Sequence, residues 1–189
     1  MTNDQINIKL LLLSDHLQNK ISNYSTNEKK QQRIEGMALL KTALKNNKMD
    51  ESFINSIYYN AYGKPFISTE IDFSISYSHT TIVLGFIKNG VIGVDVEQIK
   101  TVEGTVYKDY FTNKEWEFMN QKGFSEVTFF KLWTRKEAVV KAIGKGAFLD
   151  FNLIEVIEDS ITIEGKLLHL TTAYLEGYCL SVASTETVS

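Results

Sequence analysis

The run WTRKEAVVKAIGKG at residues 133–146 most constrains the fold, because it predicts a long helix with charges beside an apolar face. At about 100° per residue its apolar side chains gather in one stripe, and Lys136 falls within that stripe. Glu137 and Lys141 lie four residues apart along the edge of the stripe. Such a stripe packs on a core, where an uncompensated charge is costly. We therefore expect all three charged groups to have partners.

Two interpretations of these charges are open. In the structural one, Glu137 and Lys141 pair with each other while Lys136 extends its amine to water. In the functional one, the charges belong to a site. A second acidic pair upstream favours the functional interpretation.

Residues 91–97, VIGVDVE, predict a strand, because β-branched residues follow an Asn-Gly turn at positions 89 and 90. Alternation of side chains places Asp95 and Glu97 on one face. Two adjacent carboxylates repel each other, and a cation between them removes the repulsion. Oxygen ligands suit Mg²⁺, which the pair therefore indicates. The alternative is a solvent-facing strand with its acidic residues outward.

The chain resembles the 4′-phosphopantetheinyl transferases, in particular the larger, two-lobed, surfactin-synthetase-activating type. Two signatures carry the resemblance: GVDVE at 93–97, and W-x-x-K-E-A-x-x-K-x-x-G-x-G at 133–146. Weaker matches are YGKP at 62–65, FSISYS at 73–78, F-T-x-x-E-W at 111–116 and GYCLSVA at 177–183. The resemblance therefore extends over most of the chain.

The resemblance implies an α+β fold of two similar, pseudo-twofold lobes with the active site between them. We expect an N-terminal lobe at residues 1–89 for coenzyme A recognition. A C-terminal lobe at residues 90–189 would hold the magnesium-binding and catalytic motifs. Both halves of the site would then lie in one chain, which predicts a monomer.

The implied reaction transfers the 4′-phosphopantetheine arm of coenzyme A to a serine of an apo acyl or peptidyl carrier protein. It releases adenosine 3′,5′-bisphosphate. Asp95, Glu97 and Glu137 would bind Mg²⁺ against the pyrophosphate. Glu137 would also act as general base, and Lys141 would neutralise phosphate charge or protonate the leaving group.

Coenzyme A contacts are implied for the first lobe. Lys64 and Pro65 would lie at the adenine and nearby phosphate, and Ser76 at the 3′-phosphate. The family has a histidine where this chain has Tyr77, so either Tyr77 or His79 would complete that phosphate site. Lys136, from the second lobe, would contact phosphate or the carrier.

The hydrophobic pattern predicts further elements. Residues 6–13 are interpreted as the first strand, and a capped helix is expected from Ser25 to about Asn46. Further helices are expected to begin at Thr112, where Thr112 and Glu115 predict a capping box, and at about Ser125, with Gly144 ending the second. Strands are expected near residues 57–60, 73–78, 81–87, 151–157, 160–171 and 178–183.

Composition excludes several classes of protein. The 189 residues are 43% hydrophobic, which suffices for a buried core. The net charge of −3, without a long basic stripe, makes nucleic acid an unexpected partner. The single cysteine, Cys179, predicts no disulfide framework and is consistent with the cytoplasm. No segment has the roughly twenty apolar residues that a membrane span needs.

Two other functions stay open at this point. A non-catalytic module could bind coenzyme A or a carrier protein with the same fold, although it would not need all of Asp95, Glu97, Glu137 and Lys141. A different Mg²⁺-dependent nucleotide enzyme is the second alternative. The sequence does not distinguish fatty-acid, polyketide and nonribosomal-peptide carriers as substrates.

Overall fold

The computed structural model describes residues 3–10, 13–68, 70–121 and 123–187 and divides them into two compact units at residues 58 and 59. The first unit is helical. It contains α1 (Asn3–Leu10), α2 (Asp15–Ser22), α3 (Asn27–Asn46) and the 3₁₀ helix η1 (Glu51–Ser56). Its core joins Ile6 and Leu10 of α1 to Ile21 of α2 and Ile34 of α3.

The prediction of a first strand at residues 6–13 was wrong for the part that is described, since residues 3–10 form α1. Residues 11 and 12 lie outside the described part. Ile6 and Leu10 are four residues apart, so a helix places both on the face that packs against α3. The helix predicted to begin at Ser25 is confirmed with its cap one residue later, because the Thr26 hydroxyl accepts the Lys29 N–H.

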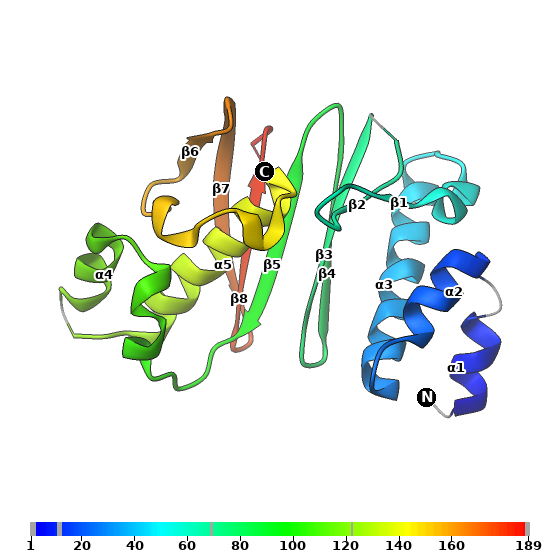
Figure 1. Cartoon of the computed structure of the whole chain (residues 1–189), viewed down its shortest axis with the longest axis horizontal. Helices are drawn as coiled ribbons and strands as arrows, with labels where there is room; N and C mark the ends of the chain where they lie inside the picture. The colour runs from blue at the N-terminus through cyan, green and yellow to red at the C-terminus, as the bar shows by residue number, and fades with distance from the viewer. Residues whose placement is uncertain (1–2, 11–12, 69, 122, 188–189) are drawn as a thin grey trace. The chain divides into compact units, whose positions relative to one another are not determined.

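The second unit contains a four-stranded antiparallel sheet of order β5-β8-β7-β6 (Figure 1). Its strands are β5 (Ile92–Gln98), β6 (Ser160–Ile163), β7 (Lys166–Leu175) and β8 (Tyr178–Ser184). Asp95 pairs with Ser181, and Glu97 pairs with Cys179. The predicted strands at 91–97 and 178–183 are confirmed as β5 and β8. The single strand predicted at 160–171 is instead two strands, β6 and β7, which pair through a turn at Glu164 and Gly165. Residues 151–157 are not a strand but contain the 3₁₀ turn η4 (Phe151–Leu153).

Helix α5 (Glu126–Ile143) packs on β5 and β8 and supplies more buried residues to the main core of this unit than any other element. The Ser125 hydroxyl accepts the Thr128 N–H at its start, and Gly144, with φ of 76°, ends it as predicted. Gly93 permits the close approach of β5, since a Cβ atom there would lie 1.9 Å from the Ala138 carbonyl oxygen. The glycine before Asp95 thus sets the distance between the acidic strand and the charged helix.

Strands β3 (Ile71–Ser78) and β4 (Thr81–Lys88) form a separate antiparallel hairpin through His79 and Thr80. The Asn89-Gly90 turn instead joins β4 to β5, which belong to different sheets. The remaining short elements are β1 (Tyr58–Tyr59), β2 (Pro65–Phe66), η2 (Gly104–Tyr110), α4 (Asn113–Asn120) and η3 (Gly146–Phe148). Helices and antiparallel sheets occupy separate stretches of the chain, as expected for an α+β protein.

Serine side chains connect the hairpin to the larger sheet. The hydroxyls of Ser74, Ser76 and Ser78 accept the N–H groups of Val94, Val96 and Gln98, over 3.1, 3.3 and 3.1 Å. The constant offset of twenty residues places β3 parallel to β5. These hydroxyls, which we call the serine row, therefore take the place of the backbone acceptors of an ordinary parallel ladder.

Candidate active site

Asp95 and Lys141 form the centre of the candidate site. The Lys141 Nζ lies 2.5 Å from Oδ1 of Asp95, whose side chain is almost completely buried. The Ser76 hydroxyl donates to the same oxygen over 2.8 Å and accepts from Lys141 over 3.1 Å. The predicted strand thus meets the predicted helix at this ion pair, in place of a direct Glu137–Lys141 pair.

The second oxygen of Asp95, Oδ2, is buried without a hydrogen-bond partner among the described residues. Buried polar atoms are almost always hydrogen-bonded or bound to an ion or water. An orphaned carboxylate oxygen therefore indicates a ligand-binding position.

Glu97 lies two residues along the same strand and is half-buried. Its Oε2 accepts a hydrogen bond of 3.1 Å from Ser78. Adjacent members of the serine row thus hold both acidic side chains of β5.

Burial is the main cause that raises the pKa of each of the three carboxyl groups, Asp95, Glu97 and Glu137. Repulsion from Asp95 adds to the rise for Glu97 and Glu137, while Lys141 opposes it in all three. Three carboxyl groups thus lie near one lysine, and a bound cation would offset the repulsion among their ionised forms.

The residues fit a divalent cation in their chemistry. All three acidic groups offer oxygen, the donor that Mg²⁺ prefers, and Oδ2 of Asp95 is the orphaned atom. No three acidic, histidine or cysteine side chains of the described ranges converge on one ion. Mg²⁺ commonly keeps waters and substrate phosphates in its shell, so one or two carboxylates can suffice.

Lys136 lies elsewhere, in the core. Its fully buried Nζ lies 2.7 Å from Oε2 of the equally buried Glu115 and donates to the carbonyls of Phe151 and Ile154. The interpretation in which Lys136 extends to water was therefore wrong. The structure gives Lys136 three internal partners and no exposed surface, so we do not retain it as a phosphate contact.

Glu115 has the predicted capping function and also connects other parts of the chain. It forms a capping box with Thr112 and also accepts the Val156 N–H over 2.9 Å. Helix α4, helix α5 and the chain after η4 therefore meet at one buried carboxylate.

Lys64 is another predicted coenzyme contact that the structure places inside. Its Nζ lies 2.5 Å from Oδ2 of Asp72 and also donates to the carbonyls of Ile92 and Ala142. Burial is the main cause that lowers the pKa of Lys64, and the pairing with Asp72 opposes it. These partners connect the chain before β2 to β3, β5 and α5, so Lys64 is structural in this conformation. The neighbouring Pro65 begins β2 and is half-buried.

The remaining predicted coenzyme contacts lie on β3 and in the turn that follows it. Ser76 faces β5, with its hydroxyl occupied by Asp95, Val96 and Lys141. Tyr77 points to the opposite face, because side chains alternate along a strand. His79 is exposed in the hairpin turn, with φ of 48°.

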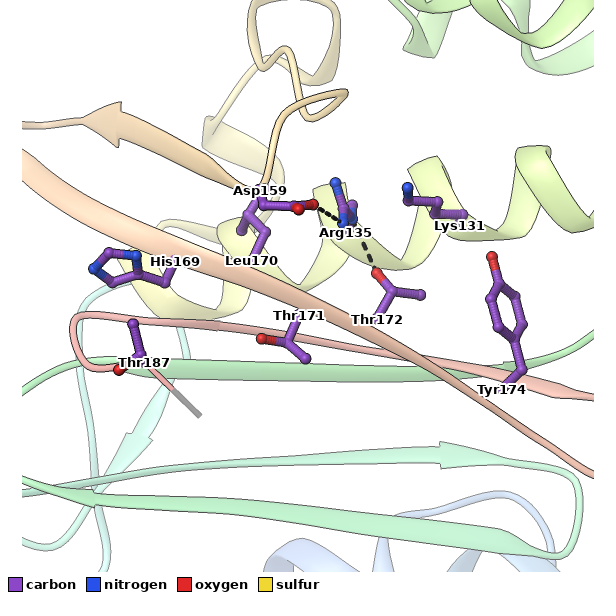
Figure 2. A pocket seen from close by; sticks show the side chains of 9 residues that line it. All are labelled: Lys131, Arg135, Asp159, His169, Leu170, Thr171, Thr172, Tyr174 and Thr187. Atoms are coloured by element: carbon purple, nitrogen blue, oxygen red, sulfur yellow. Dashed lines mark hydrogen bonds and ion pairs between the residues drawn. The ribbon is translucent and has the colours of Figure 1, made fainter. Parts of the chain in front are cut away.

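A surface pocket of about 530 Å³ lies apart from these residues, along β7 and the first half of α5 (Figure 2). The buried Arg135 forms one wall and binds Asp159 over 2.6 Å, Thr172 over 2.9 Å and three backbone carbonyls. No predicted site residue lines this pocket. The sequence analysis assigns no function to Arg135. Its position inside an otherwise apolar helix is the one feature of the sequence that indicates a buried, paired arginine.

Residues 91–183 match the family model of the 4′-phosphopantetheinyl transferase superfamily. The predicted resemblance is confirmed over this segment, which includes Asp95, Glu97, Glu137 and Lys141.

Curated relatives carry the same description. The chain is 39% identical over 95 residues to 4′-phosphopantetheinyl transferase gsp of Aneurinibacillus migulanus, covering 49% of this chain and 40% of that protein. It is 33% identical over 99 residues to 4′-phosphopantetheinyl transferase Sfp of Bacillus subtilis (strain 168), covering 50% of this chain and 44% of that protein. It is 34% identical over 73 residues to a holo-[acyl-carrier-protein] synthase of Caldicellulosiruptor saccharolyticus, covering 38% of this chain and 59% of that protein. The chain therefore spans less than half the length of the first two relatives.

Across the described ranges, every helix is too short or too polar to cross a membrane.

Proposed function

We propose that this protein transfers the 4′-phosphopantetheine arm of coenzyme A to a serine hydroxyl of an apo carrier protein. The observation that carries the proposal is the orphaned Oδ2 of Asp95, in a cluster of carboxyl groups beside Lys141. The superfamily match of residues 91–183 and the names of the relatives support the same reaction. Coenzyme A and an acyl or peptidyl carrier would be the two substrates.

In this proposal Asp95, Glu97 and Glu137 would provide the carboxylate ligands of Mg²⁺, directly or through bound waters. The ion would stabilise negative charge on the pyrophosphate oxygens. The carrier serine attacks the β-phosphorus, the bridging phosphorus–oxygen bond breaks, and adenosine 3′,5′-bisphosphate leaves with the bond electrons. Glu137 accepts the serine proton, directly or through a water. Lys141 neutralises phosphate charge or protonates the leaving group as it separates.

A raised pKa suits Glu137 for this role. Burial and the nearby Asp95 make its carboxylate a stronger base than an exposed glutamate. The same carboxylate would have its charge compensated when the cation binds. The two-lobed pseudo-twofold arrangement, the monomeric state and the cytoplasmic location remain predictions.

Intact-mass spectrometry tests the function directly. An apo carrier protein is incubated with this protein, coenzyme A and Mg²⁺, and a mass gain of one phosphopantetheine group is expected. Glu137→Gln should abolish the gain, whereas Glu117→Gln, the same change at an exposed position of α4, should leave it intact. No gain with acyl and peptidyl carriers, despite measurable coenzyme A binding, would overturn the transferase proposal in favour of a binding module.

A further inference from the structure

We propose that Ser78 is a positioning residue that fixes the metal-facing orientation of Glu97. This inference rests on the proposed function, because it concerns one of the carboxylates assigned to the cation. Ser78 itself belongs to none of the predicted catalytic, coenzyme or metal positions.

The first step is the contact geometry of Ser78. Its hydroxyl accepts the Gln98 N–H over 3.1 Å and donates to Oε2 of Glu97 over 3.1 Å. A hydroxyl has one proton. With the backbone N–H approaching its lone pairs, that proton is directed toward the glutamate.

The second step is the freedom of Glu97. A glutamate has three rotatable side-chain bonds, and Glu97 lies one residue before the end of β5, where it is only half-buried. Asp95, in contrast, is shorter, almost completely buried and held by both Ser76 and Lys141. Glu97 therefore depends more strongly on its one hydrogen bond from β3 for a defined orientation.

The third step is the matched member of the serine row. Ser74 is also buried and accepts the Val94 N–H over 3.1 Å, the same length as the Ser78 bond. Its place in the register lies beside Gly93, which has no side chain to receive a hydrogen bond. Ser74 thus contributes to the junction of β3 and β5 in the way that Ser78 does, but without contacting a carboxylate.

Variants of Ser74 and Ser78 therefore distinguish a residue that positions a metal ligand from one that only supports the junction of β3 and β5. Ser74→Ala and Ser78→Ala each remove one hydroxyl acceptor from the junction, so both should lower the thermal midpoint to a similar extent. Only Ser78→Ala should weaken binding of the cation. Loss of a residue that orients a metal ligand typically reduces metal affinity about tenfold or more.

The experiment measures Mn²⁺, as a paramagnetic substitute for Mg²⁺, by electron paramagnetic resonance on the full chain with saturating coenzyme A. We expect Ser78→Ala to raise the Mn²⁺ dissociation constant about tenfold. Ser74→Ala should leave it within about twofold of the unsubstituted protein, and Ser78→Thr, which keeps the hydroxyl, should restore it. The Mg²⁺ concentration for half-maximal carrier modification should change in the same order, with the KM for coenzyme A unchanged.

The outcomes distinguish the two proposals. Equal Mn²⁺ affinities in the Ser74 and Ser78 variants, or no metal binding by the unsubstituted protein, would overturn the assignment of Ser78. An unsubstituted protein that binds Mn²⁺ normally but modifies no carrier would overturn the proposed function alone. In that case the Mn²⁺ comparison still decides the role of Ser78.

Discussion

The Lys136 ammonium lies 2.7 Å from the Glu115 carboxylate, and neither side chain is exposed to solvent. Lys136→Met keeps the side-chain length but leaves Glu115 without its buried counter-ion. We expect this substitution to lower the free energy of unfolding by about 3–5 kcal/mol in urea denaturation.

Lys114→Met is the matched control for that experiment, because Lys114 pairs with Glu155 over 3.2 Å at the surface. Exposed pairs contribute about 0–1 kcal/mol, so this variant should unfold close to the unsubstituted protein. Equal losses in the two variants would show that the Lys136–Glu115 pair has no special importance.

Glu137→Gln is expected to increase stability while abolishing transfer. Burial first, and Asp95 next, raise the pKa of Glu137, so the folded state binds a proton more readily than the unfolded state. The stability from this group is therefore present at low pH and is lost as the pH rises through the raised pKa. Glutamine has no charge to bury and avoids this loss. We therefore expect Glu137→Gln to raise the free energy of unfolding by about 1 kcal/mol at pH 7.

The gain from Glu137→Gln should shrink as the pH is lowered, since the native glutamate becomes protonated. Urea denaturation from neutral to acidic pH measures it, with Glu117→Gln as the exposed control. A gain that stays constant over this pH range would contradict the electrostatic explanation.

Gly93→Ala should strongly destabilise the second unit. The added Cβ would lie 1.9 Å from the Ala138 carbonyl oxygen and 2.4 Å from the Ala142 nitrogen, so α5 and β5 must separate. We expect the free energy of unfolding, measured by urea denaturation, to fall by about 3 kcal/mol or more. Gly165→Ala, at a turn with open space and φ of 71°, should cost only the backbone strain of about 1–2 kcal/mol. Similar losses at the two glycines would argue against the close contact.

Lys141→Met and Asp95→Asn should show coupled effects on unfolding. Each single change leaves one charge of a largely buried pair without its partner, which should cost about 2 kcal/mol. The double variant removes both charges, so its loss should fall short of the sum by about 1–3 kcal/mol. A double-mutant cycle by urea denaturation measures this coupling, and additivity would contradict a direct interaction.

Local patterns predicted the parts of the fold that depend on local physics. The capping box of Thr112 and Glu115, the start of α5 at about Ser125 and its end at Gly144 were all predicted and confirmed. Alternation in β5 correctly placed Asp95 and Glu97 on the same side, facing α5 and the serine row. These signals are short in sequence and need no knowledge of distant contacts.

The errors arose where tertiary contacts decided the outcome. An apolar run at residues 6–13 suits a strand or a buried helix, and packing against α3 selected the helix for residues 3–10. Lys64 and Lys136 were assigned to ligands from their motifs, and the structure adds internal partners that the motifs do not reveal. The half-buried Asp72 and the buried Glu115 lie 8 and 21 positions away, and only the folded chain brings each lysine to its partner.

Serines alternate in the sequence at positions 74, 76 and 78, and this pattern was not interpreted in the sequence analysis. In a backbone ladder, the carbonyl oxygens of β3 would have accepted the N–H groups of β5 and had nothing to donate in return. A hydroxyl accepts from the backbone and still gives a proton to the neighbouring side chain. By breaking one continuous sheet into two, the chain thus acquires hydrogen-bond donors beside Asp95 and Glu97 that six strands joined only through their backbones would lack.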